Sequence, residues 1–507
     1  MKNKIFLLED LKEVVSREKL KGKKIVLCHG VFDLLHIGHI KHFKEAKKFG
    51  DVLVVTLTPD VHVNKGPDRP AFNEKLRLEG IASLDTVDYV ALNSTPTAVN
   101  VIKKIKPNLY CKGPDYKNHQ NDISGEIKNE INAIKKINGK VVYTSDITFS
   151  STKLINKYLS NNSDLQKKII DKVKKFYTFP QIRKLIDSFK KVKVLVIGET
   201  IIDQYSFTEA LGKSGKEPVL VLRDINMDQY AGGALAIARH LSDFCDKISI
   251  LTMLGENKDY LDFVSESLAN NISPYFIFKT GAPTITKKRY VDKVSKSKSL
   301  GVYSINDTQM NKKDQNELKK NLLNLIPKHD IIIVTDYGHG FISGDIAKYI
   351  SKQSVFTSLN AQINAANIGY HTMNNYNNID CAIINEGELR HEMRDRETDI
   401  KKLMKKLTIS LELKILVVTQ GNNGATLYSA DNKKYYHCPA FASKVVDKIG
   451  SGDAMLALLS CALKSGFNPD LALFIGSLAA AQSVETIGNS SAVNKKQLIK
   501  TFNHSLK

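Results

Sequence analysis

The sequence predicts an α/β protein made of two doubly wound parallel sheets in series. Three observations support this prediction. Strand-like apolar runs alternate with helix-like segments from about residue 23 to 159, the alternation stops over 160–190, and it restarts at 191. Such alternation is typical of parallel sheets with helices on both faces. The length of 507 residues suits two such domains, because α/β domains of about 250 residues are common.

The first domain, Rossmann-like in its alternation, is expected over 1–159. Its predicted strands cover 23–32, 51–57, 87–92 and 108–112, and its predicted helices cover 38–49 and 73–83. The second domain is expected over 191–507. Its apolar strands are predicted at 193–203, 247–255, 329–338, 378–385 and 413–421, before a glycine-rich turn at 450–453 and an apolar helix.

The segment 160–190 is polar and lysine-rich, and we interpret it as a helical linker. Fragments 1–165 and 186–507 are therefore expected to fold separately, because few contacts cross such boundaries. The alternative is an amphipathic helix that docks on one domain. Apolar residues at near-helical spacing favour this alternative; they are Leu165, Ile169, Ile170, Val173 and Phe176.

The composition is that of an ordinary globular protein, with 42% hydrophobic and 25% charged residues. The net charge of +21 comes from lysines in many short groups rather than one stripe, which favours solvated faces over a nucleic-acid partner. The cysteines lie far apart, with no spacing suited to zinc and no disulfide framework. The sequence has no unbroken run of about 18 apolar residues, so no membrane span is expected. Acidic residues interrupt the N-terminal stretch, so no signal peptide is expected. We expect a cytoplasmic protein with no membrane and no nucleic-acid partner.

The first candidate site is His36-Ile37-Gly38-His39, where a strand turns into a helix. Both imidazoles can face one side of the helix N-terminus, where free N–H groups and the helix dipole attract phosphate. Gly38 would let a nucleotide approach the backbone. His36 and His39 would stabilise charge on the α-phosphorus during transfer. The alternative is a chance pair of surface histidines.

These residues belong to a longer stretch that resembles the nucleotidyltransferase superfamily, which includes cytidylyltransferases and the adenylyltransferase half of a bifunctional heptose enzyme. The likeness covers about 23–159 in four ordered motifs: GVFDLLHIGH, VNKGPDRPAFNEKLR, YCKGPDYK and SSTKLI. It implies nucleotide binding by Gly30, Phe32, Asp33, Gly38, Lys65, Arg77, Lys112, Ser151 and Thr152, and substrate binding by Asp115. His29 departs from the heptose enzymes, which more often carry Asn, and leaves the base or substrate preference open.

A different class of enzymes also contains the first motif. HIGH is a signature of class I aminoacyl-tRNA synthetases, and Lys293-Val294-Ser295-Lys296-Ser297 resembles their second signature. SSTKLI already supplies the second phosphate element too soon for an interposed synthetase domain. The sequence therefore favours the nucleotidyltransferase.

The second candidate site is Gly450-Ser451-Gly452-Asp453, at the start of an apolar helix. The glycines can direct N–H groups into an anion hole, and Asp453 can take a proton from a hydroxyl that attacks a γ-phosphate. The alternative is an ordinary helix N-terminus preceded by glycines, which would have the same sequence.

From about 191 to 490 the sequence resembles the ribokinase-like sugar kinases, a fold with a small β lid. The likeness implies that Asp453 is the base, that Gly450, Ser451, Gly452, Gly421 and Gly424 bind nucleotide, and that Asn385 and Glu388 serve Mg²⁺. Asp203, Gly232, Gly233 and Arg289 would bind the sugar. KVSKS then falls in the lid, which removes the second synthetase signature.

Three positions depart from that family: Lys448 replaces a Thr, Ala236 an Asn, and Gln362 a Lys. Ala236 removes a polar group from the expected sugar pocket, and Gln362 removes a phosphate contact. We infer an altered sugar and a retained kinase, with a pseudokinase as the alternative. The domain order is also inverted relative to the heptose enzyme, which places its kinase first.

The sequence thus predicts a bifunctional enzyme of nucleotide-activated sugar synthesis. ATP would be the phosphoryl donor and CTP or ATP the nucleotidyl donor, with Mg²⁺, and a heptose-like sugar phosphate is favoured as substrate. A homodimer is expected, because lids of this kinase class often pair. The alternatives are a polyol or glycerol-type kinase and cytidylyltransferase, or a non-catalytic nucleotide-fold protein.

Overall fold

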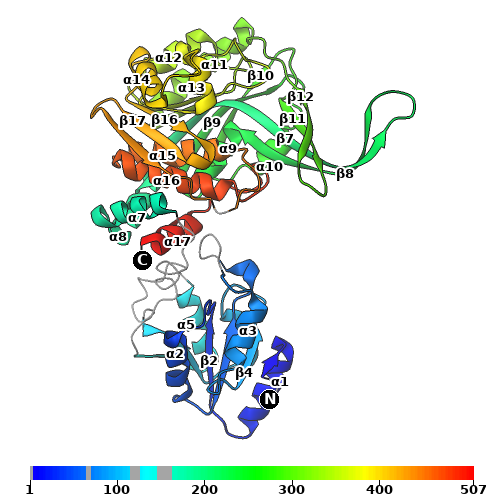
Figure 1. Cartoon of the computed structure of the whole chain (residues 1–507), viewed down its shortest axis with the longest axis vertical. Coiled ribbons are helices and arrows are strands. Elements are labelled where there is room, and N and C mark those ends of the chain that lie inside the picture. Colours follow the sequence, from blue (N-terminus) through cyan, green and yellow to red (C-terminus); the bar gives the residue numbers. More distant parts are fainter. Residues whose placement is uncertain (1–3, 64–69, 115–125, 146–162, 443, 507) are drawn as a thin grey trace. The chain divides into compact units, whose positions relative to one another are not determined.

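The computed structural model describes residues 4–63, 70–114, 126–145, 163–442 and 444–506. They form two compact units, Met1–Asn161 with Ile499–Lys507, and Asn162–Leu498 (Figure 1). Each contains a sheet of mainly parallel strands, so the predicted α/β class is confirmed. Among the described helices none combines the length and apolarity that a membrane crossing requires.

The first unit is a six-stranded, fully parallel sheet in the order β1-β4-β3-β2-β5-β6. The strands are β1 (Ile5–Phe6), β2 (Ile25–Gly30), β3 (Val52–Leu57), β4 (Tyr89–Leu92), β5 (Leu109–Lys112) and β6 (Lys140–Tyr143). The chain runs outward from β2 in both directions, so β2 and β5 flank the switch point of the sheet. Ligands of such sheets bind at the carboxyl ends of the strands at this point.

Helices cover both faces of this sheet, as expected where parallel strands are uniformly apolar. One core contains side chains of α1 (Leu8–Leu20), α4 (Val99–Ile105) and α5 (Ile127–Lys135). The opposite core contains Phe43 and Ala46 of α2 (Ile37–Lys47) and Ile81 of α3 (Glu74–Ala82). The predicted helices 38–49 and 73–83 correspond to α2 and α3.

The second unit contains a sheet in the order β10-β9-β7-β13-β14-β15-β16-β17-β18, parallel up to β16. The strands are β7 (Lys193–Lys213), β9 (Lys247–Gly255), β10 (Ile272–Lys279), β13 (Ile331–Asp336), β14 (Phe356–Ala361), β15 (Cys381–Asn385), β16 (Ile415–Thr419), β17 (Ala425–Ser429) and β18 (Lys434–Cys438). Strand β14 was missed by the sequence analysis, because its FTSLNA is too polar to stand out.

One face of this sheet buries α11 (Lys312–Leu325), α12 (Gly344–Ser351), α13 (Glu386–Glu392) and α14 (Ile400–Ser410). Helices α9 (Ala234–Leu241), α15 (Ser451–Lys464) and α16 (Pro469–Ser483) pack together, and α15 also contacts β13, β14 and β15. Helix α15 is apolar almost all round, with nine buried residues, as a helix enclosed by neighbours must be.

The predicted β lid is present and grows out of the main sheet. Strand β7 leaves the sheet after Glu199 and continues as an antiparallel partner of β8 (Leu220–Gly233) and a parallel partner of β11 (Thr286–Asp292). Strand β12 (Lys298–Ser304) pairs with β11. The β7–β8 ribbon projects away from the body of this unit (Figure 1). The KVSKS residues form the β11–β12 connection, as the sequence analysis expected.

The segment predicted as a linker forms two helices, α7 (Asp164–Phe176) and α8 (Phe179–Ser188), which belong to the second unit. Ile170, Val173, Ile182 and Ile186 are buried. Gln166 donates a hydrogen bond to the Ala440 carbonyl oxygen, and Lys172 pairs with Asp470. The structure therefore favours the docking alternative over a free linker, although Leu165 and Phe176 of the proposed apolar face are exposed.

The second compact unit thus takes in residues 162–190 in addition to the predicted domain that starts at 191. The last helix, α17 (Lys495–Leu506), crosses the division at Leu498, so Ile499–Lys507 cluster with the first unit rather than with the predicted kinase domain.

Candidate active sites

A cavity of about 340 Å³ lies at the carboxyl edge of the main sheet in the second unit. It is reached by the ends of β7, β13, β14, β15 and β16, because parallel strands all end at the same edge. The lid and the start of α15 complete it. Of the predicted residues, those brought together in its lining are Asp203, Gly233, Arg289, Asn385, Glu388, Gly450, Ser451, Gly452 and Asp453.

Asp453 lies in the first turn of α15, facing this cavity. The Tyr337 hydroxyl donates a hydrogen bond of 3.0 Å to its Oδ1. Desolvation is the largest cause that raises the pKa of Asp453, the carboxylates of Asp203 and Glu388 add to it, and the net result is a pKa of about 7. The Tyr337 hydrogen bond and the Lys287 ammonium oppose this rise. A carboxyl group with a pKa near 7 is suited to accept a proton as a general base.

The turn before Asp453 depends on glycine. Gly450 is the N-cap of α15 with φ of +84°, and a Cβ there would collide with the side-chain oxygen of Asn489. The first N–H groups of a helix have no partner within it. In the 14-residue α15 those groups open toward the cavity, where they can bind an anion.

The lid contributes an ion pair to the opposite wall of the cavity. Arg289 Nη1 on β11 lies 2.5 Å from Asp203 Oδ1 on β7, and both side chains are largely buried. The Asp203 carboxylate leaves no room for a side chain at Gly232, which lies behind the lining rather than in it. Gly233, with φ of +60°, starts α9 against the Glu199 backbone. These glycines therefore shape the wall that Asp203 occupies.

Asn385 and Glu388 form a capping box at the start of α13. The Asn385 side chain accepts from the Glu388 N–H at 2.8 Å, and Glu388 Oε2 accepts from the Asn385 N–H at 2.8 Å. Burial raises the pKa of Glu388 to about 7. Carboxylate oxygens are the ligands that Mg²⁺ prefers. A bound cation would also reduce the charge repulsion between the carboxylates of Glu388 and Asp453. The charged Glu388 carboxylate therefore fits the predicted magnesium site better than the neutral Asn385 amide.

Asp447 lies three residues before Gly450 and ties the turn at the start of α15 to the lid. It accepts from the Tyr205 hydroxyl at 2.7 Å and from the Gly488 N–H at 3.1 Å, and it pairs with Lys298 at 2.7 Å. Lid strand β12 and the α15 turn are thus held by one carboxylate, whose pKa these partners lower despite its burial.

The three family departures lie in different places. Lys448 and Gln362 line the cavity, so they replace the expected side chains within it. Ala236 is buried inside α9 and is not part of the lining. The altered-sugar inference therefore rests on Lys448 and Gln362 rather than on Ala236.

Gly421 and Gly424 form the turn between β16 and β17 and are not part of the cavity lining. Gly424 has φ of +85° and packs against the Cys438 carbonyl oxygen. A larger hollow of about 780 Å³ lies along α13, lined by Arg390, Arg394 and Arg396 with His371 and His391. Glu392 and Asp395 also line this hollow, and Arg390 pairs with Glu386, so its wall carries charges of both signs.

In the first unit, His36 and His39 lie at the N-terminus of α2. His36 is the N-cap, and its Nδ1 accepts from the Gly38 N–H at 3.0 Å. The two rings stack with centroids 3.9 Å apart, so both imidazoles do lie on one side of the helix start. Desolvation lowers the pKa of His36. Neutral rings can still donate one hydrogen bond each to phosphate oxygens.

The loop that leads into this helix is conformationally unusual. Phe32 and Leu34 have positive φ values of 48° and 52°. The Phe32 ring packs on Gly30, where a Cβ would lie 3.1 Å from it. Asp33 is buried and accepts from the Ala71 and Phe72 N–H groups. Strained backbone held by such contacts is characteristic of functional loops.

Two predicted nucleotide ligands are engaged elsewhere. Arg77 is buried, donates to the carbonyl oxygens of Phe72, Val31 and Thr58, and pairs with Asp60. Lys112 is buried and lies 2.9 Å from Glu130 Oε2. Arg77 thus ties loops of the first unit together, and Lys112 ties the end of β5 to α5. The other predicted residues, Lys65, Asp115, Ser151 and Thr152, lie outside the described residues.

The cavity residues that the sequence analysis did not single out include Lys287, Tyr337 and Asn489. Lys287 precedes Arg289 by two, so strand alternation places both on one side of β11, and this signal could have found it. Tyr337 lies near the end of the predicted strand at 329–338. Asn489 follows α16, far from any motif, and no signal in the sequence indicated it.

The pfkB family carbohydrate kinase profile matches residues 191–496, which include the whole described cavity. The fold and the cavity are therefore those of a sugar-kinase class. The chain belongs to the pfkB family of carbohydrate kinases. A second profile, cytidylyltransferase-like, matches residues 27–157, which include His36 and His39.

Curated relatives resemble a part of the chain. The "Bifunctional protein HldE" of Geobacter metallireducens is 44% identical over 115 residues, 22% of this chain and 24% of that protein. The protein of the same name from Aliarcobacter butzleri is 39% identical over 135 residues, 26% of this chain and 28% of that protein. The chain thus spans about a quarter of the length of these relatives, in its N-terminal part.

Among solved structures, phosphofructokinase-2 from Escherichia coli in complex with substrates and products has a TM-score of 0.50 at 14% identity. The likeness covers 62% of this chain and 99% of that one. At this identity it supports the fold of the second unit alone.

Proposed function

We propose that the chain is a bifunctional enzyme of nucleotide-activated sugar synthesis. The second unit would phosphorylate a sugar or sugar phosphate with ATP, and the first would transfer a nucleotidyl group from CTP or ATP to a sugar phosphate. The observation that carries the proposal is the meeting, in one cavity, of Asp453, the open N–H groups of α15 and the Asp203–Arg289 pair.

In the proposed kinase step, Asp453 accepts the proton of the substrate hydroxyl as that oxygen attacks the γ-phosphorus. The N–H groups at the start of α15 would stabilise the charge that develops on the phosphoryl oxygens. Asp203 and Arg289 can hold the hydroxyl and phosphate groups of the sugar. Mg²⁺ would be held by Glu388 and would neutralise nucleotide phosphate charge.

In the proposed transfer step, the attacking atom is an oxygen of the sugar phosphate, and pyrophosphate leaves from the α-phosphorus. The stacked His36 and His39 at the α2 N-terminus would donate to the α- and β-phosphate oxygens. The cytidylyltransferase-like match over 27–157 supports this assignment.

A heptose-type substrate is the favoured assignment. It is supported by the KGPDYK motif and by the name of the relatives that match the N-terminal part. The test is mass spectrometry of products from heptose, hexose and polyol phosphates incubated with ATP, CTP and Mg²⁺. If only polyol phosphates were converted, the heptose assignment would be replaced by a polyol one. If ATP and CTP were consumed with none of these substrates, the proposed enzyme activity would be contradicted.

We further propose that the chain forms a homodimer through the lid. Strand β8 pairs with β7 alone in the described part of the chain, so its other edge is open. The lid also exposes apolar side chains along the β7–β8 ribbon and on β12 at its other edge, and exposed edges of this kind favour association; they are Leu211, Val219, Leu220, Ile225, Met227, Leu300 and Val302.

The dimer can be tested by light scattering on a matched pair of variants. Leu300 in the lid and Leu323 on α11 are equally exposed, at 56% each. Leu300→Asp should shift the protein to monomer, whereas Leu323→Asp should leave the mass unchanged. A wild-type protein that is monomeric at all concentrations would contradict the proposal.

A further inference from the structure

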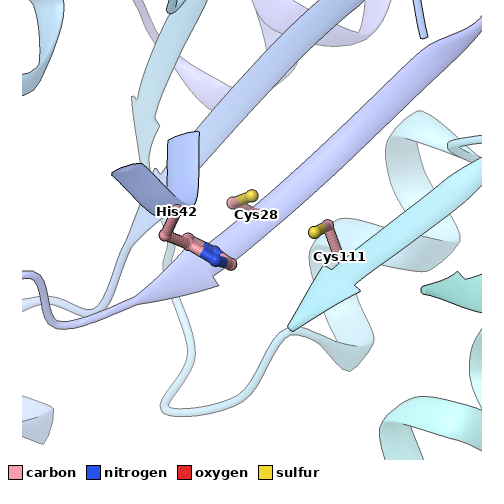
Figure 2. A group of neighbouring side chains, drawn as sticks. All are labelled: Cys28, His42 and Cys111. Atoms are coloured by element: carbon pink, nitrogen blue, oxygen red, sulfur yellow. The ribbon is translucent and has the colours of Figure 1, made fainter. Parts of the chain in front are cut away.

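Two cysteines and a histidine converge in the first unit, in a cluster that the proposed transfer step does not use (Figure 2). Cys28 lies on β2, Cys111 is its paired neighbour on β5, and His42 reaches them from α2. One ligand-type atom from each of the three side chains lies within 4.8 Å of the other two. Both cysteines are buried free thiols.

Thiolate sulfur together with imidazole nitrogen is the donor set that Zn²⁺ favours. A tetrahedral ion with Zn–S bonds of about 2.3 Å holds its ligand atoms roughly 3.5 to 4 Å apart. The distances between the three atoms here need to shorten by only about 1 Å for the atoms to bind one ion. Rotation of the side chains about their own bonds can supply such a shift.

The charges of the cluster also suit a buried ion. On binding, each thiol releases its proton, and two thiolates with a neutral imidazole balance the two positive charges of Zn²⁺. The resulting group has no net charge, so it avoids the large cost of burying an unpaired charge.

The orientation of His42 is held by a second contact. Its Nδ1 lies 3.1 Å from the hydroxyl oxygen of Thr144, a buried residue just after β6. When Nδ1–H donates to that oxygen, the other ring nitrogen, Nε2, carries the lone pair that a metal needs. Metal-binding histidines are commonly fixed by such a hydrogen bond.

We propose that Cys28, Cys111 and His42 form a metal site for Zn²⁺, with a fourth position for water. The ion would join α2 to β2 and β5. Since α2 begins with His36 and β2 ends at Gly30, the ion would fix the elements that carry the proposed phosphate-binding loop. The competing explanation is that the cysteines only fill the apolar core with Phe43 and Ala46.

The test is Co²⁺ and Zn²⁺ binding to the metal-free full-length protein, kept reduced with a phosphine. Co²⁺ bound by thiolates gives an intense sulfur-to-metal absorption that oxygen ligands at a magnesium site do not give. We expect this absorption in the wild type, its loss in Cys28→Ala/Cys111→Ala, and its retention in Cys245→Ala/Cys461→Ala. The control pair is apt because those thiols are also buried neighbours, 4.0 Å apart in the second unit.

Competition with a chromophoric chelator would measure the affinity for Zn²⁺. We expect Thr144→Val to weaken it by about 10-fold or more, as loss of an outer-shell hydrogen bond does elsewhere, and Thr144→Ser to restore it. His42→Ala should weaken it further. No sulfur-to-cobalt absorption in the wild type would overturn the proposal, whatever the folding of the variants, and so would wild-type Zn²⁺ affinity in folded His42→Ala.

Discussion

Asp453 has a carboxyl group whose protonation is set by its neighbours. If it is the base of the proposed kinase, Asp453→Asn removes the acceptor of the hydroxyl proton. We expect sugar phosphorylation to fall by about 10²-fold or more, while nucleotidyl transfer stays at the wild-type rate. Coupled assays of both activities on one preparation measure this. Near-normal kinase turnover in the variant would show that the base is another group.

The pKa of about 7 for Asp453 also predicts a pH dependence. Kinase turnover should rise as the pH increases through about 7, because only the ionised carboxylate accepts a proton. The Tyr337 hydrogen bond lowers this pKa, so Tyr337→Phe should move the rise to higher pH, by about one unit for a charged hydrogen bond of 1.5 kcal/mol. The pH profiles of kcat are measured at saturating Mg²⁺, because the bound ion would keep its proposed ligand Glu388 ionised. An unshifted profile in Tyr337→Phe would contradict the assignment of the rise to Asp453.

His36 and His39 allow the reciprocal experiment in the first unit. Each should donate to phosphate charge that is greatest in the transition state, so His36→Ala or His39→Ala should reduce nucleotidyl transfer by about 10²-fold. The kinase should be spared. Because His36 also caps α2, His36→Asn is the matched variant: it keeps a capping side chain and should still lose transfer. Equal loss of both activities would indicate unfolding instead.

At the scale of elements, the start of α15 requires glycine for two separate reasons. Gly450 and Gly466 flank this helix, both with positive φ. A Cβ at Gly466 meets nothing within 4 Å, whereas one at Gly450 meets Asn489. Gly466→Ala should therefore cost about 1 to 2 kcal/mol of unfolding free energy from φ alone.

Gly450→Ala should cost more than Gly466→Ala and should also lower kinase turnover, because Asn489 and the open N–H groups must move. Urea unfolding and kinase assays of the two variants compare the effects directly. Equal stability losses with equal turnover would mean that contact with Asn489 does not matter.

Other elements show where local patterns were sufficient. The predicted strands and helices of both domains were found because each has continuous apolar character or helical periodicity, as in β3, whose six residues are all buried. Helices α7 and α8 were placed correctly as helices, but their packing was not foreseen. Their few apolar residues gain significance only when the surface that they cover is known.

At the scale of the whole molecule, the question is whether each unit folds alone. The sequence predicts that 1–165 and 186–507 are independent, but α7 and α8 bury Ile170, Val173, Ile182 and Ile186 in the second unit. We therefore expect 162–507 to unfold cooperatively with kinase activity, and 186–507 to be less stable by several kcal/mol, since a buried Ile side chain contributes about 2 to 5 kcal/mol.

Thermal unfolding of the two C-terminal fragments, together with the N-terminal fragment 1–165, measures these differences. Equal melting temperatures of 162–507 and 186–507 would restore the linker interpretation. Recovery of stability only when 162–185 is present would show that these helices belong to the core of the second unit.

The sequence by itself determined the α/β class, the order of the two units, and the contiguous motifs around His36 and Gly450-Ser451-Gly452-Asp453. These features are local, because periodicity and short turns are encoded by neighbours in the chain. They sufficed to identify Asp453 and the two histidines as candidates before any coordinates.

Only the tertiary structure decided which of those residues meet and which are engaged elsewhere. Arg77 and Lys112 are predicted phosphate ligands, and in the structure both are buried, Arg77 beside Asp60 and Lys112 beside Glu130 of α5. Cys28 and Cys111 show no metal spacing in the sequence, but adjacent strands pair them across 83 residues and α2 brings His42 to them. Contacts between distant segments depend on strand order and helix packing, which no local pattern specifies.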